Sequence, residues 1–119
     1  MTFTTLVITD DSCERASTKL IELIEKLRQV KSARLYILIR GQGVSTVIPR
    51  VREALLSNLS TGIRLYIFSN ADELQKLVDD CVKELGRVDH AYVIIDDDSL
   101  RDSTLRILNR YGINDVSIC

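Results

Sequence analysis

One unit recurs along this chain: a short apolar strand, then a turn, then a single amphipathic helical stretch. Three of the strand cores are nearly the same, reading Arg-Leu-Tyr-Ile at 34–37, Arg-Leu-Tyr-Ile at 64–67 and Ala-Tyr-Val-Ile at 91–94. Strands this apolar need cover on both faces, and their alternation with helices is typical of a parallel sheet. The chain is therefore predicted to fold as an α/β protein.

Hydrophobic periodicity sets the ranges of the elements. Near-continuous apolar runs predict strands over 3–9, 33–39, 63–68, 91–95 and 116–118. Apolar residues at three- and four-residue spacing predict four helices, over 12–30, 45–59, 71–85 and 99–110. We expect one domain, residues 1–119, built as a three-layer sandwich with a five-stranded parallel sheet and four helices.

Residues at the expected helix ends agree with these ranges. The spacing of an N-cap and an acidic third residue occurs in three pairs, Asp11 with Glu14, Asn70 with Glu73, and Ser99 with Asp102. Glycines that can close a last helical turn follow three of the helices, at Gly62, Gly86 and Gly112.

Composition excludes several classes of function. A net charge of −1 argues against nucleic-acid binding, which needs clustered basic residues. No apolar run approaches the roughly 20 residues of a membrane span, and the first residues lack a basic signal-peptide region. Three cysteines and one histidine, His90, share no zinc-ligand spacing. We expect a cytoplasmic monomer with no cofactor, no small-molecule substrate and no membrane partner.

Five aspartates follow two of the strands: Asp10 and Asp11 after the first, and Asp96, Asp97 and Asp98 after the fourth. Ligands of open parallel sheets bind beyond the carboxyl ends of the strands. If the first and fourth strands are neighbours, these carboxylates are candidate ligands for Mg²⁺ or Ca²⁺. In the stronger alternative, Asp98 or Ser99 caps a helix and the other aspartates are turn residues, so the site holds no metal.

Residues 69–89, which end in Gly-Arg-Val-Asp, and residues 33–40 resemble the core of short-chain dehydrogenase/reductase Rossmann domains. The resemblance implies the strand order 3-2-1-4-5; the flavodoxin-like order 2-1-3-4-5 is the alternative. It also places Arg40 where NADP-preferring members often carry a basic residue. The family's functional motifs are missing, because Asp10, Glu14 and Ala16 stand where its glycine fingerprint requires glycines, and no Tyr-x-x-x-Lys occurs. We therefore expect no dinucleotide binding.

Other candidate residues favour structural roles. Asp10 and Asp11 are similar to the acidic pair of response-regulator receivers, but Ser69 and Asn70 replace the phosphoacceptor aspartate. Cys13 falls in a first helical turn, where nearby acidic groups disfavour a thiolate. His90 precedes the fourth strand and is interpreted as a strand-entry residue.

The sequence thus predicts an architecture without an enzymatic activity. We expect a stable scaffold, of the kind an artificial Rossmann-like sequence would form, because every local signal agrees with the fold. Two alternatives stay open: a small nucleotide- or divalent-metal-binding protein that uses the carboxyl edge of the sheet, and a non-catalytic partner-binding module.

Overall fold

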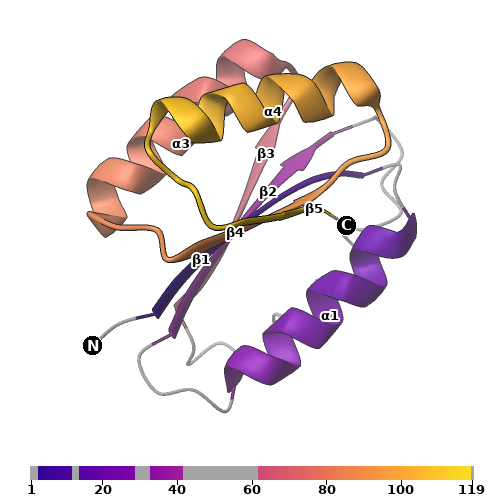
Figure 1. Cartoon of the computed structure of the whole chain (residues 1–119). Helices are drawn as coiled ribbons and strands as arrows, with labels where there is room; N and C mark the ends of the chain where they lie inside the picture. Colours follow the sequence, from indigo (N-terminus) through magenta and orange to yellow (C-terminus); the bar gives the residue numbers. More distant parts are fainter. Residues whose placement is uncertain (1–2, 12–13, 29–32, 42–61, 119) are drawn as a thin grey trace.

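The computed structural model describes residues 3–11, 14–28, 33–41 and 62–118 (Figure 1). Its strands are β1 (Phe3–Asp10), β2 (Ala33–Arg40), β3 (Gly62–Phe68), β4 (His90–Ile94) and β5 (Val116–Ile118). Its helices are α1 (Glu14–Arg28), α3 (Ala71–Leu85) and α4 (Asp98–Arg110). These bounds lie within two residues of the predicted ones; the further helix expected over 45–59 falls outside the described residues.

The five strands form one parallel sheet in the order β3-β2-β1-β4-β5. This confirms the order 3-2-1-4-5 and shows that the flavodoxin-like alternative is wrong. The chain order reverses between β1 and β4, so the segments that follow these two strands leave the sheet side by side.

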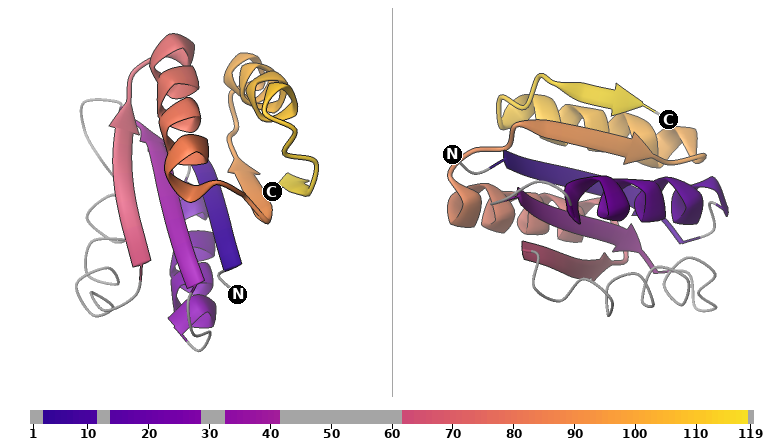
Figure 2. Two further views of the ribbon diagram at one scale, coloured as in Figure 1. Left: turned by 90° about the vertical axis from the view of Figure 1, so that its left-hand side faces the viewer. Right: turned by 90° about the horizontal axis from the view of Figure 1, so that it is seen from below.

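Helices cover both faces of the sheet, which confirms the layered arrangement. Figures 1 and 2 show α3 and α4 together on one face and α1 on the other. In the described part of the chain, none of these helices is both long enough and apolar enough to cross a membrane.

The core divides into two clusters because successive side chains of a strand point to opposite faces. Leu6 and Ile8 of β1 belong to the cluster under α3 and α4, whereas Val7 packs with Leu20 and Ile24 of α1. All five side chains are fully buried. Burying a side chain of this size stabilises the fold by about 1.5–3 kcal/mol, so the central strand carries much of the stability.

The helix ends confirm part of the predicted capping. Asn70 caps α3, with its Oδ1 accepting from Glu73 N at 3.0 Å, and Gly86 and Gly112 both have φ near +70°. One prediction was wrong: α4 is capped by Asp97, not by Asp98 or Ser99. Gly62 is the first residue of β3, and the helix that it was expected to follow lies outside the described residues. The predicted N-cap at Asp11 is followed by residues 12–13, which lie outside the described residues, so this cap stays a prediction.

Candidate functional site at the carboxyl edge of the sheet

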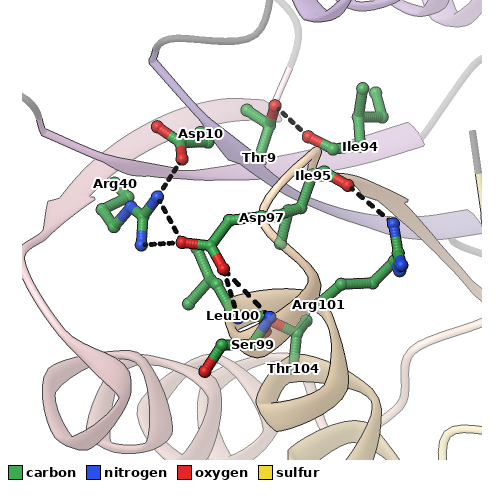
Figure 3. A network of polar contacts seen from close by, with 10 residues as sticks. All are labelled: Thr9, Asp10, Arg40, Ile94, Ile95, Asp97, Ser99, Leu100, Arg101 and Thr104. Carbon is green, nitrogen blue, oxygen red and sulfur yellow. Dashed lines mark hydrogen bonds and ion pairs between the residues drawn. The ribbon is translucent and has the colours of Figure 1, made fainter.

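The carboxyl ends of β1, β2 and β4 meet at one edge, shown from close by in Figure 3. Asp10, the last residue of β1, lies in register with Arg40, the last residue of β2. Thr9 ties the same end of β1 to β4, because its Oγ1 donates to the carbonyl oxygen of Ile94 at 2.6 Å. Asp96 and Asp97, and Asp98 at the start of α4, follow β4 at the same edge.

Arg40 joins the two acidic segments (Figure 3). Its Nη2 pairs with Asp10 Oδ2, and both Nη1 and Nη2 lie 3.3 Å from Asp97 Oδ2. The side chains of Asp10 and Arg40 are only 3% and 18% exposed, whereas that of Asp97 is 42% exposed. A carboxylate as buried as Asp10 needs a positive partner to remain charged, and the guanidinium provides one.

Asp97 uses its two carboxylate oxygens for different tasks. Oδ1 accepts from the backbone N–H of Ser99 at 2.9 Å and of Leu100 at 3.2 Å, while Oδ2 faces Arg40. The hydrogen bond from Leu100, helped by Arg40, holds the pKa of Asp97 below its usual value. The same carboxylate therefore caps α4 and completes the contact with Arg40.

Asp96 and Asp98 lie further out and pair with other arginines. Arg15 Nη2 of α1 contacts Asp96 Oδ1 at 2.5 Å, and Arg101 of α4 pairs with Asp98. Asp96 and Asp98 are both largely exposed, so each pair contributes about 0–1 kcal/mol. The first contact ties the loop after β4 to α1, whereas the second lies within the first turn of α4.

Asp11 is buried at the same edge. Its backbone N–H donates to the carbonyl oxygen of Arg40 at 3.1 Å, and Gly41 N–H donates to Phe68 O at 2.9 Å. These bonds extend the pairing of β1, β2 and β3 past the ends of the strands. These backbone hydrogen bonds hold the ends of β1 and β2 in place next to the side-chain contacts of Arg40.

The prediction that the two acidic loops lie close together is confirmed, but Arg40 lies between their carboxylates. Within residues 3–11, 14–28, 33–41 and 62–118, no group of three or more Asp, Glu, His or Cys side chains is placed to hold a metal ion. The sequence interpretation missed this role of Arg40. The signal was its place at the end of the second strand, next to the first strand in the expected order.

The other residues singled out from the sequence lie elsewhere. Cys13 is outside the described residues. Tyr36 is buried and donates through its hydroxyl to Glu84 Oε1 at 2.8 Å, and burial, followed by this bond, raises the pKa of Tyr36. His90 begins β4 as expected.

Comparison with known proteins adds information on the fold alone. No protein-family model and no curated protein matches the chain. A hypothetical protein from Sulfolobus tokodaii, known from its crystal structure, is similar over 98% of this chain and 94% of its own, with a TM-score of 0.55 and 17% sequence identity.

Proposed function

We propose that this chain is a compact α/β scaffold that carries no nucleotide- or metal-dependent chemistry at the carboxyl edge of its sheet. The observation that supports this most directly is the position of Arg40. Its guanidinium lies between Asp10 and Asp97, at the edge where sheets of this order bind their ligands.

A phosphate group would meet unfavourable chemistry at this edge. Anions bind at helix N-termini through free backbone N–H groups and the positive end of the helix dipole. At α4 the N–H groups of Ser99 and Leu100 already donate to the Asp97 carboxylate. The neighbouring carboxylates of Asp96 and Asp98 would repel a phosphate further.

A divalent cation would have to displace the Arg40 side chain. Mg²⁺ and Ca²⁺ bind carboxylate oxygens, and those of Asp10 and Asp97 that face each other are in contact with the guanidinium. A cation and a guanidinium cannot share this space, because like charges a few ångströms apart repel strongly. The arrangement favours a closed edge over a metal site.

The agreement between local and global signals also supports a scaffold. Asn70, Asp97, Gly86 and Gly112 all lie at helix ends where their chemistry is needed. In the described residues, every fully buried side-chain nitrogen or oxygen has a hydrogen-bond partner. This is the consistency expected of a sequence that specifies one stable structure, and an artificial Rossmann-like origin remains part of the proposal.

The test is a ligand screen by thermal melting and calorimetry, with NADH, NADPH, ATP, Mg²⁺ and Ca²⁺ at millimolar concentration. A ligand present at 100 times its Kd would stabilise the fold by about 2.7 kcal/mol, which is a Tm shift of roughly 10 °C. We expect no saturable shift for the wild-type chain.

Arg40→Met shows whether the edge is closed by this side chain. We expect Mg²⁺ or Ca²⁺ to raise the Tm of Arg40→Met, because the substitution removes the guanidinium between Asp10 and Asp97. Arg101→Met is the matched control, since Arg101 pairs with the exposed Asp98, and its Tm should not respond to the cation. Saturable binding of any of the five ligands to the wild-type chain would overturn the proposal.

A further inference from the structure

The single histidine of the chain connects two side chains at the opposite edge of the sheet. His90, the first residue of β4, has its Nε2 at 2.9 Å from Ser117 Oγ and its Nδ1 at 3.0 Å from Asp115 Oδ1. Ser117 lies in β5, and Asp115 immediately precedes that strand. Serine, imidazole and carboxylate therefore follow one another at hydrogen-bonding distance.

The carboxylate determines which way the imidazole is oriented. An ionised Asp115 can only accept a hydrogen bond, so the proton of neutral His90 lies on Nδ1 and donates to Asp115. Nε2 is then an acceptor, and the hydroxyl of Ser117 donates to it. This is the sequence of bonds by which an imidazole withdraws the proton of a serine hydroxyl.

We propose that Ser117 is a nucleophile, with His90 as its general base and Asp115 as the residue that positions His90. The site would transfer small acyl groups from aryl esters to water. This activity goes beyond the function proposed for the carboxyl edge, and it departs from the sequence-based expectation that the chain is not an enzyme.

The surroundings of Ser117 argue for an aryl ester. Tyr92 lies opposite Ser117 in the pairing of β4 with β5. Its ring packs edge-on against His90, with the centroids 4.4 Å apart, and Lys19 of α1 approaches the same ring at 5.5 Å. An aromatic ring beside the nucleophile offers a surface for another aromatic ring, so an aryl group can rest there.

The edge position of β5 also provides a donor for the developing oxyanion. β5 is the last strand of the sheet, and the carbonyl oxygen of Asp115 accepts from Ala91 N at 2.9 Å. Backbone groups alternate in direction along a strand, so the N–H of Ile118, next to Ser117, points to the open edge. The N–H that follows a nucleophilic serine is a common oxyanion donor.

The reaction balances without a cofactor. Ser117 Oγ attacks the ester carbonyl carbon as its proton passes to His90 Nε2, and the bond to the phenolate oxygen breaks. The phenolate leaves, and His90 gives its proton to the phenolate or to solvent, which returns the imidazole to its neutral form. Water then attacks the acyl-serine with His90 as base, releasing the carboxylic acid and restoring the serine hydroxyl.

The exposure of His90 and Asp115 sets the expected rate of acylation. The side chain of His90 is 16% exposed, but that of Asp115 is 74% exposed, so water competes for the carboxylate. The buried carboxylate of a serine protease is worth about 10⁴ in rate, and an exposed one should contribute far less. We expect slow acylation in which Asp115 accounts for roughly a tenfold effect.

The experiment measures covalent labelling by an alkyl fluorophosphonate, a serine-directed probe, and release of p-nitrophenol from p-nitrophenyl acetate. The mass of the intact protein measures the extent of labelling. Peptide mapping then identifies the labelled residue and distinguishes a label on Ser117 from one on a cysteine or a lysine. We expect one label, on Ser117, absent from Ser117→Ala and slowed at least roughly tenfold in His90→Gln. Ser103→Ala, a change at another partly buried serine, is the matched control and should label as the wild type does.

Asp115 needs a readout that loss of structure alone would not change. The ¹⁵N shifts of the one histidine ring report which nitrogen is protonated; Asp115→Asn should shift the tautomer towards Nε2–H, and Asp115→Glu should restore it together with the labelling rate. Cooperative thermal melts at the wild-type Tm show that each variant is folded. Equal labelling of wild type, Ser117→Ala and His90→Gln, or no label on Ser117, would overturn the proposal.

Discussion

Replacing Arg40 by methionine tests whether the contact between Arg40 and Asp10 holds the carboxyl edge together. Methionine keeps most of the length and apolar volume of the arginine stem but removes the guanidinium. Asp10 would then keep a carboxylate that is only 3% exposed without the positive charge that faces its Oδ2. The substitution therefore isolates the electrostatic part of the contact.

The expected loss follows from the burial of the pair. Removing one partner of a buried ion pair costs about 3–5 kcal/mol, because the other charge stays buried. Arg40 is 18% exposed, so water reaches this pair in part and we expect about 2–3 kcal/mol. For a chain of this length that loss corresponds to a Tm lower by roughly 6–15 °C.

Urea unfolding followed by circular dichroism measures the change in the free energy of unfolding. Arg40→Met with Asp10→Asn completes a double-mutant cycle, and the second change should restore part of the lost stability by removing the buried charge. The control Arg101→Met changes an arginine whose partner, Asp98, is largely exposed, and should stay within about 0.5 kcal/mol of the wild type. If Arg40→Met and Arg101→Met lose equal stability, or the cycle gives no coupling between residues 40 and 10, the reasoning is refuted.

Two further predictions concern the core and the cap of α4. Val7→Asp should cost several kcal/mol, since Val7 is fully buried between β1 and α1, and a melt at the wild-type temperature would contradict the central place of β1. The pKa of Asp97 is held below 3.8, so its ionised form adds stability that is present above that pH and is lost as the pH falls through the lowered value. Asp97→Asn keeps an N-cap side chain but has no charge to titrate. The free energy of unfolding of this variant should fall less between pH 5 and pH 2 than that of the wild type. An equal fall in both proteins would count against the role of Asp97.

The fold could be predicted because the apolar pattern determines it almost alone. Strand cores such as 34–37 are too apolar to have a solvent-facing side, and the helix over 71–85 was predicted to the residue because Asn70 and Gly86 mark its two ends. The strand order came from a family resemblance, since hydrophobic pattern does not say which strands are neighbours. Once β1 and β4 are adjacent, the closeness of the two acidic loops follows.

The partners within the site could not be predicted, because they depend on strand register and on side-chain reach. Arg40 contacts Asp10 only because β2 pairs with β1 so that the last residues of both strands coincide. The cap was misplaced by one or two residues for a related reason: three successive aspartates can all cap a helix, and the position of Arg40 favours Asp97. His90 was assigned to the start of a strand correctly, but its partners, Asp115 just before the last strand and Ser117 within it, lie 25 and 27 residues further along.

The two edges of the sheet differ in how far their polar groups are already used by the protein. At the carboxyl edge, Arg40 contacts two carboxylates and one of these also caps α4, so an incoming ligand must break internal contacts before it can bind. At the other edge, His90 of β4 contacts Ser117 of the outermost strand β5 and Asp115, the residue that precedes that strand. If the chain has chemistry of its own, these contacts place it at the amino edge of β4 and β5, away from the edge that the fold class would suggest.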